Sequence, residues 1–314
     1  MASFLVTGGG GFIGSHLVEE LVKRGEKVRV LDDFSRGKRG NLDPVRNSIE
    51  LIEGDIREQS TVRDVTKGID FVLHQVAMTP RIGANEDLLD LYDVNVVGTW
   101  NILEAAQRTR VKRLVFASSY VVYGFESEIP VRENMAPKVS SPYSETKLIA
   151  EQDVQAFTYA HGLQTVILRY FNVFGPRQNL DSTYTLGIPQ LIKNVSRNEP
   201  LGLFGNSGQI FDFTYVANIV NANLLAITSK EIIPGRVFNI GTGCGLSLGQ
   251  IVDYLRDSRK CTNEVEFVND PSTNFIYPNI ADIRRAQASL GYEPVLLYFE
   301  RLGKLIVGNT EEEK

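Results

Sequence analysis

A tyrosine and a lysine four residues apart, Tyr143 and Lys147, carry the strongest catalytic signal in the chain. Ser141 and Pro142 precede them and predict a helix cap and a first turn, so both side chains lie on one helix face. A phenol with a pKa near 10 is a poor base at neutral pH, but a nearby ammonium favours the phenolate. Lowering that pKa by about three units takes roughly 4 kcal/mol, which two close cations in a partly dry site can supply. The pair predicts a general base, although a surface pair with this spacing would look the same.

A serine-bearing loop lies about two dozen residues before Tyr143. A predicted strand runs into Ser118 and Ser119, and Ser119 is placed to hydrogen-bond the same substrate oxygen that Tyr143 deprotonates. The sequence therefore predicts Ser119, Tyr143 and Lys147 as the catalytic residues, with no metal required.

A run of glycines near the N-terminus predicts a phosphate-binding turn. Phe4–Val6 form an apolar strand, the glycines follow, and an amphipathic helix pattern begins directly after them. Glycine lets the backbone approach a pyrophosphate, and the helix N-terminus then faces the anion. The spacing fits either Gly8, Gly11 and Gly14 or Gly9, Gly11 and Gly14. A plain tight turn between strand and helix is the alternative.

Two acids end the next predicted strand, Lys27–Leu31. Asp32 lies about twenty residues beyond the glycines, where a dinucleotide-binding fold places a carboxylate on the ribose hydroxyls. Such a carboxylate repels a 2′-phosphate, which favours NAD over NADP. The alternative is that Asp32 and Asp33 only cap a loop, and the basic residues between 36 and 39 leave NADP open.

Two further loops follow predicted strands, where open α/β sheets bind their ligands. Gly54, Asp55 and Ile56 offer a carboxylate for an adenine edge, although a surface turn fits them equally well. The other loop, Gln75–Met78, has small residues that would let a cofactor lie close.

Short apolar runs alternate with amphipathic ones through the first half of the chain. The expected strands are 3–7, 28–32, 49–53, 71–74, 114–118 and 165–170, and the expected helices are 14–24, 60–66, 94–109 and 144–161. This order predicts a doubly wound parallel sheet covered on both faces. Beyond Asn172 the regularity weakens, so we expect a cofactor domain at 1–171 and a smaller α/β substrate domain at 172–314.

Composition is that of an ordinary globular protein. Of 314 residues, 43% are hydrophobic and 23% charged, and the net charge of −5 argues against a nucleic-acid binder. Cys244 and Cys261 lack disulfide or metal spacing and are expected to be buried or half-buried thiols of a reducing compartment. With no apolar run of membrane-spanning length and no signal peptide, the expectation is a cytoplasmic enzyme.

Together these motifs resemble the extended short-chain dehydrogenase/reductases that act on nucleotide sugars. The resemblance reaches from the N-terminus to about Pro294. It rests on Thr7–Gly14, Ser118-Ser119, Tyr143 with Lys147, and the run Arg169–Gln178. It is closest to UDP-hexose 4-epimerases, particularly those that accept N-acetylhexosamines, through Leu31–Gly37, His74-Gln75 and Ile188-Pro189.

The resemblance implies NAD as the cofactor, with Ser119 and Tyr143 at the reacting hydroxyl and Asn172 on the substrate's phosphate. It also implies a homodimer paired through the helices at 94–109 and 144–161. The implied cofactor contacts, beside the glycines, are Phe12, Ile13, Asp32, Asp33, Phe34, Ser35, Arg36, Gly37, Asp55, Ile56, Gln75, Val76, Ala77, Asn95, Ser118, Tyr143, Lys147, Tyr170 and Phe171.

Three alternatives to a 4-epimerase remain. Dehydratases of the family usually carry an Asp-Glu pair after the catalytic hydroxyl residue, where this chain has Tyr120 and Val121, neither suited to water elimination. The others are an NAD-dependent dehydrogenase or reductase and a non-catalytic NAD-binding scaffold.

The chain departs from the family at two arginines expected on the diphosphate. Phe211 stands at one position and Ser272 at the other, so the diphosphate is expected to be held differently, with Arg177 and, more speculatively, Arg81 as substitutes. The alternative is a substrate that carries less negative charge, with Phe211 packing against an apolar or ring group. Asn279 occupies the position of a bulky tyrosine in strict glucose/galactose epimerases, which predicts room for an N-acetyl group.

Overall fold

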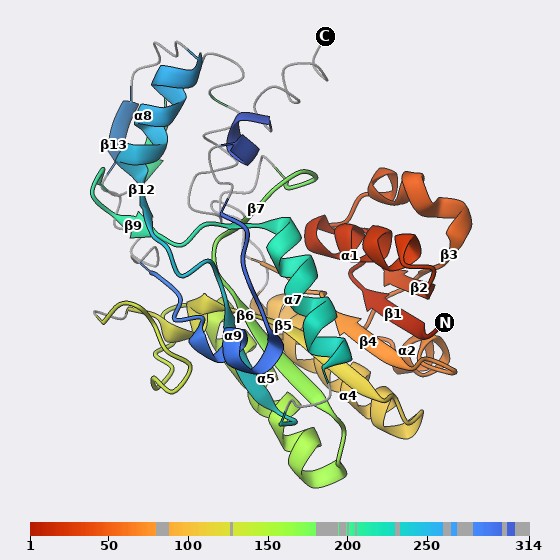
Figure 1. Ribbon diagram of the computed structural model, residues 1–314. Helices are drawn as coiled ribbons and strands as arrows, with labels where there is room; N and C mark the ends of the chain where they lie inside the picture. Colours follow the sequence, from red (N-terminus) through yellow and green to blue (C-terminus); the bar gives the residue numbers. More distant parts are fainter. Residues whose placement is uncertain are drawn as a thin grey trace.

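A seven-stranded parallel sheet forms the centre of the computed structural model (Figure 1). The strand order is β3-β2-β1-β4-β5-β6-β11, the doubly wound order that the alternating pattern predicts. The strands are β1 (Ser3–Thr7), β2 (Lys27–Asp32), β3 (Ile49–Glu53), β4 (Phe71–His74), β5 (Arg113–Ser119), β6 (Thr165–Tyr170) and β11 (Arg236–Ile240). The structure describes residues 1–79, 88–125, 128–179, 194, 199, 201–204, 206–229, 233–259, 265–268, 279–296 and 300–304.

Helices cover both faces of the sheet, because alternate strand residues point to opposite sides. Phe4 and Val6 of β1 pack with α1 (Phe12–Lys23), the 3₁₀ segment η1 (Arg39–Ser48), α7 (Val216–Thr228) and α9 (Arg284–Leu290). Leu5, between them, faces α2 (Gln59–Val65), α4 (Thr99–Arg108) and α5 (Pro142–His161). Figure 1 shows α1 and α7 side by side on one face.

The strands and helices expected in the first half of the chain are confirmed, and their ends differ from the expected ones by about two residues or fewer. One expected helix is the exception. The helix expected at 94–109 begins as a short α3 (Leu88–Tyr92) and a π-helical turn η2 (Asp93–Gly98) before α4. The predicted cap of α5 is present, since Ser141 Oγ accepts a hydrogen bond from Ser144 N at 3.2 Å and Pro142 occupies the first turn.

The chain returns to the sheet after residue 172, because β11 extends its edge and α7 covers it. The division at 171/172 therefore does not separate the sheet from the remainder, and as a functional boundary it stays a prediction. The smaller part contains the paired strands β7 (Val173–Phe174) with β10 (Thr214–Tyr215), β9 (Ile210–Phe211) with β12 (Leu246–Ser247), and β8 (Leu201–Phe204) with β13 (Val265–Val268), beside α8 (Leu248–Arg259).

Some sequence predictions fall outside the described residues: Arg81, Ile188-Pro189, Cys261 and Ser272. Cys244 is exposed, in a turn after β11, which contradicts the expected burial. No helix in the described part of the chain is long and apolar enough to cross a membrane.

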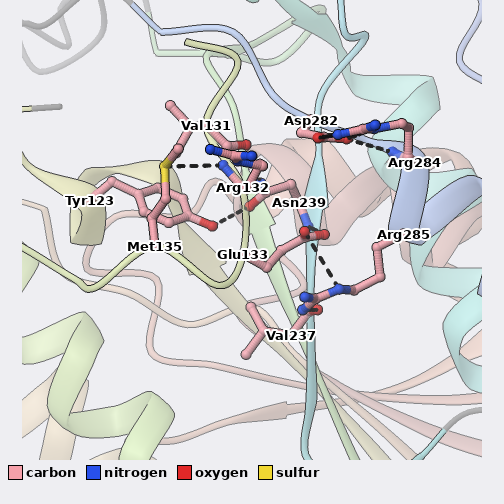
Figure 2. A network of polar contacts seen from close by, with 10 residues as sticks. All are labelled: Tyr123, Val131, Arg132, Glu133, Met135, Val237, Asn239, Asp282, Arg284 and Arg285. Carbon is pink, nitrogen blue, oxygen red and sulfur yellow. Dashed lines mark hydrogen bonds and ion pairs between the residues drawn. The ribbon is translucent and has the colours of Figure 1, made fainter. Parts of the chain in front are cut away.

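A polar network ties the segment 131–135 to β11 and to the strand-like residues 279–282 (Figure 2). Glu133 accepts a bond from Asn239 N at 3.0 Å and pairs with Arg285 Nε at 3.5 Å. Val131 N donates to Ile280 O at 2.7 Å, and Asn239 Nδ2 donates to Val131 O at 2.9 Å. This network joins the sheet to the smaller part.

Asp212 is the buried centre of the smaller part. Its carboxylate is fully buried and accepts bonds from Thr242 N at 2.8 Å, Gly243 N at 2.9 Å and Ala281 N at 3.1 Å, and from the Thr242 hydroxyl. These bonds bring the turn after β11 against the residues around 281.

Replacing Asp212 with asparagine should lower the free energy of unfolding by about 2–3 kcal/mol, because an amide cannot accept all four bonds and leaves buried N–H groups unsatisfied. Urea unfolding measures the change. Asp253→Asn, an exposed change of the same kind on α8, is the control and should shift stability by less than about 0.5 kcal/mol. Equal stabilities of the two variants would contradict the role of Asp212.

Candidate active site

A cavity of about 250 Å³ opens where the first four strands of the sheet end. Its walls come from the glycine turn, the end of β2, and the loops after β3 and β4. The lining includes Gly8, Gly11, Leu31, Asp32, Asp33, Ser35, Arg36, Gly37, Gly54, Asp55, Ile56, Arg57, Gln75, Val76, Ala77, Met78, Asp90 and Val94. Most residues predicted for the adenosine half of a dinucleotide are thus brought together.

The glycine turn has the close packing that a pyrophosphate cradle requires. A Cβ on Gly14 would lie 2.0 Å from Gly8 O, and Gly8 itself has a positive φ of 71°. Helix α1 starts at Phe12, and its cap, Gly11, places no side chain over the first N–H groups. The turn therefore presents free helix-end donors to an anion.

Asp32, predicted to bind ribose hydroxyls, lines the cavity at the end of β2. Gly10 N donates to Asp32 Oδ2 at 2.8 Å and Phe34 N donates to Oδ1 at 2.8 Å, so each oxygen keeps a lone pair for a ligand. Burial raises the pKa of Asp32, and the two backbone donors oppose this effect. Asn41 Nδ2 donates to Gly10 O at 2.9 Å, which ties the loop after β2 to the glycine turn.

Arg57 closes the cavity beside Asp55 and was not anticipated from the sequence. Its Nε donates to Asp55 Oδ2 at 2.8 Å, and its Nη1 reaches Asp90 at 3.3 Å. Burial raises the pKa of Asp55, but the hydrogen bonds of Arg57 outweigh this and leave it lowered. The carboxylate predicted to meet adenine is therefore fixed in place as an anion.

The predicted base and its lysine lie at the buried start of α5. Tyr143 is 6% exposed and Lys147 2%, and Lys147 Nζ sits over the ring of Phe116 at 4.3 Å. Ser119 is half-buried at the end of β5. Burial raises the pKa of Tyr143, and burial lowers the pKa of Lys147 to about 7 against the opposing charge of Glu151.

Glu151 is a buried carboxylate that the sequence analysis missed. It accepts bonds from Arg169 Nε at 2.9 Å and Nη2 at 2.6 Å, and from the hydroxyl of Ser118. The only available signal was its spacing of four residues from Lys147, since its partners lie on β5 and β6.

His74, named from the sequence only for the family resemblance, is buried and neutral. Burial, followed by the charge of Lys147, lowers its pKa to about 3. Thr99 Oγ1 donates to Asn95 O at 2.7 Å, so it must accept from His74 Nε2 at 3.0 Å. His74 Nδ1 must then accept from Thr7 Oγ1 at 2.6 Å, which fixes the tautomer and links β1, β4 and the start of α4.

Two predicted cofactor residues have side chains already committed to the protein. Asn95 donates to Met78 O at 2.9 Å and to Thr146 Oγ1 at 3.1 Å, and accepts from Met78 N at 2.7 Å. The Tyr170 hydroxyl donates to Gln75 Oε1 at 3.2 Å and accepts from Asn223 Nδ2 at 2.7 Å. These contacts shape the walls of the site, so any contact of Tyr170 with a cofactor would be made by its ring.

The predicted substrate residues Asn172 and Asn279 lie together. Asn172 Nδ2 donates to Asn279 Oδ1 at 2.6 Å and to Asp212 O at 2.9 Å, so both its N–H groups have partners inside the protein. Asn279 is 3% exposed and also hydrogen-bonds the hydroxyl of Tyr120. The Tyr120 ring packs on Phe171 with centroids 5.4 Å apart.

Of the other two predicted substrate residues, Phe211 pairs with Asn279 through the main chain, whereas Arg177 is held against α1. Arg177 Nη2 pairs with Glu19 Oε2 at 2.6 Å, which holds its guanidinium against α1. Phe211 is fully buried, with its ring 5.9 Å from that of Phe213. Neither geometry supports a phosphate or substrate contact, and those roles stay predictions.

Known proteins resemble the chain over nearly its full length. Residues 4–241 match the NAD dependent epimerase/dehydratase family. A putative UDP-glucose 4-epimerase of Methanocaldococcus jannaschii is 33% identical over 96% of each chain. The structure of a Thermotoga maritima UDP-glucose 4-epimerase with UDP-glucose superposes with a TM-score of 0.91 at 28% identity, covering 99% of this chain and 100% of that one. A UDP-N-acetylglucosamine 4-epimerase of Methanobrevibacter ruminantium gives the same TM-score and identity, covering 99% of each chain.

Gly14→Ala should weaken NAD binding at least tenfold, because its Cβ would displace the backbone of Gly8. Calorimetric titration of NAD measures the effect. Gly40→Ala is the matched control, since its Cβ would meet only Asp43, at an ordinary 3.6 Å. Equal NAD affinities in the two variants would show that the turn does not form the cradle.

Proposed function

The chain belongs to the NAD dependent epimerase/dehydratase family, and from this premise we propose that it is a 4-epimerase of a UDP-linked hexose or N-acetylhexosamine. It is an enzyme, and NAD is its cofactor. The observation that carries the proposal is the buried face of α5, which holds Tyr143 and Lys147 and packs against β5, the strand that ends at Ser119. We further propose that it acts in the cytoplasm.

NAD, when bound, takes up a hydride from C4 of the sugar and returns it. Tyr143, as the phenolate, accepts the proton of the C4 hydroxyl, and Ser119 orients that hydroxyl. Lys147 supplies the positive charge that stabilises the phenolate against the effect of burial. The 4-keto sugar would turn over in the pocket, so that C4 takes the hydride back on its other face while Tyr143 returns the proton to the C4 oxygen.

The residues after Ser119 favour this reaction over dehydration. Tyr120 is half-buried, and burial raises its pKa, so it stays protonated. Val121 carries no ionisable group.

A dehydrogenase would consume added NAD, whereas an epimerase recycles it, and a scaffold would convert no sugar. Chromatography of UDP-glucose and UDP-galactose, with absorbance at 340 nm, separates the three; net NADH formation or no conversion of any UDP-sugar would overturn the proposal.

Tyr143→Phe should reduce turnover by more than a hundredfold, because the base is lost, while NAD binding persists. The readout is the rate of UDP-sugar interconversion. Tyr159→Phe removes a hydroxyl from the same helix at a side chain that is 78% exposed, and it should retain the full rate. Activity of Tyr143→Phe above about a hundredth of wild type would argue against the assigned base.

Asn279 should set the tolerance for an N-acetyl group. A tyrosine there would occupy the space beside Asn172 and displace the hydroxyl of Tyr120, so Asn279→Tyr should reduce turnover of N-acetylated relative to plain UDP-hexoses by at least tenfold. The ratio of the two kcat/KM values tests this. An unchanged ratio would place the determinant elsewhere.

At the two positions where the family carries arginines on the diphosphate, this chain has Phe211 and Ser272. The two arginines expected from the family are absent from the sequence, and Asn172 has both N–H groups engaged. We propose that UDP is held without these arginine contacts and more weakly than in relatives that carry them.

The chain should form a homodimer through the faces of η2, α4 and α5, together with α3, which directly precedes η2. Leu89, Tyr92 and Trp100 are 70%, 43% and 46% exposed, and Tyr159 is 78% exposed on α5. Trp100 packs edge-on against Phe157 at 4.9 Å, which joins the two helices into one apolar face. Such a face favours a partner.

Sedimentation at micromolar concentration should give about twice the 35.0 kDa chain mass, and Trp100→Glu should shift the protein to monomer. Asn221→Glu, an exposed change on α7, is the control and should leave the dimer intact. A wild-type monomer would end this proposal.

A further inference from the structure

A buried cluster of three charges lies behind the predicted base. Glu151 is 3% exposed and Arg169 4%, and Lys147, one helical turn before Glu151, is 2% exposed. Tyr143, Lys147 and Glu151 are spaced four residues apart on α5, so they share one face of the helix. Glu151 bonds Arg169 through both carboxylate oxygens and also accepts the hydroxyl of Ser118, beside Ser119.

The cluster is not charge-balanced on its own. Two cations, Lys147 and Arg169, face one carboxylate, Glu151, which leaves one net positive charge in a buried site. Ionisation of Tyr143, one turn before Lys147 on the same helix face, would cancel this charge. A desolvated charge is costly unless it is compensated, so the cluster favours the phenolate of Tyr143.

We propose that Glu151 is a positioning residue. Its negative charge keeps Lys147 protonated, and the one positive charge that remains in the cluster stabilises the phenolate of Tyr143. The inference rests on the proposed function for its meaning in catalysis. Its basis is the bidentate pair with Arg169 at 2.9 and 2.6 Å and the position one turn from Lys147.

The other groups around Lys147 do not replace Glu151. Phe116 of β5 offers only its ring face, and His74 of β4 is neutral and held by Thr7 and Thr99. Beyond Arg169, the ring of Tyr123 lies 4.6 Å from the guanidinium carbon. Farther out, Glu133 pairs with Arg285 and is balanced there (Figure 2).

The charge of Lys147 should therefore respond in opposite directions to removal of its two neighbours. Glu151→Gln leaves two cations without an anion, so Lys147 loses its proton at lower pH. Arg169→Gln leaves the carboxylate facing Lys147 alone, so the lysine keeps its proton to higher pH. If the Glu151–Arg169 pair only stabilised the fold, both variants would be less active, but their pH profiles would not shift in opposite directions.

The experiment measures kcat/KM for UDP-glucose against pH in the NAD-loaded enzyme. The pH at which activity falls on the alkaline side should move down by about one unit in Glu151→Gln and up by about one unit in Arg169→Gln. The double variant should return toward wild type, and Glu151→Asp should lie between wild type and Glu151→Gln. Glu145→Gln, an exposed acid on the same helix, is the control and should not shift the profile.

A second readout keeps the inference separate from the proposed function. Ultraviolet difference titration, with Tyr143→Phe as reference, reports ionisation of Tyr143 in the NAD-bound protein without any turnover. Arg169→Gln should raise the pKa of Tyr143 by about one unit. If wild type converts no UDP-sugar, the proposed function fails and this titration still tests the cluster. Shifts of the same sign in both single variants, or an unshifted tyrosine in Arg169→Gln, would overturn the inference.

Discussion

The burial of the Lys147 ammonium group constrains the packing of α5 against β5 and β6. Lys147 is 2% exposed, and an isolated charge at that depth would lose its proton. The ring face of Phe116 below it and the carboxylate of Glu151 one turn away oppose that loss. Glu151 is in turn bonded by Arg169 of β6 and Ser118 of β5, so these bonds fix α5 to the sheet.

A separate steric constraint governs the cofactor end. The turn after β1 can close onto α1 only because Gly14 leaves space for Gly8 O. Asp32 and Asn41 then bind the same turn through Gly10, so the loop after β2 follows wherever the glycines place it. His74 and Thr99 link this region to Asn95 and, through Thr146, to α5. Neutral, hydrogen-bonded side chains therefore connect the region of the glycine turn with α5.

Much of the fold and part of the candidate site could be predicted from the local periodicity of the sequence. Strand alternation and glycine spacing depend on neighbouring residues, so the sheet, the turn and the Tyr143–Lys147 face could be derived from sequence. The partners of Glu151 and Asp212 could not, because they lie 18 and 30 or more residues away and are set by tertiary packing. The π-helical start of the second long helix was also hidden, since Val94 and Asn95 fit a regular helix equally well. Arg177 was expected at a phosphate, but its positive φ and its pairing with Glu19 turn it to α1.

The strand-like residues 279–282 are held on both sides by main-chain bonds, in addition to the bond from Ala281 N to the Asp212 carboxylate. Asn279 N donates to Ile210 O at 3.1 Å and Asp212 N to Asn279 O at 2.9 Å, while Val131 N and Asp282 N pair across to segment 131–135. None of these bonds depends on which side chain stands at 279. Among side chains that fit this buried position, exchanges at 279 can therefore change the sugar wall that we propose there while the main-chain bonds persist, which gives one ancestral enzyme a route to paralogues with different substrates.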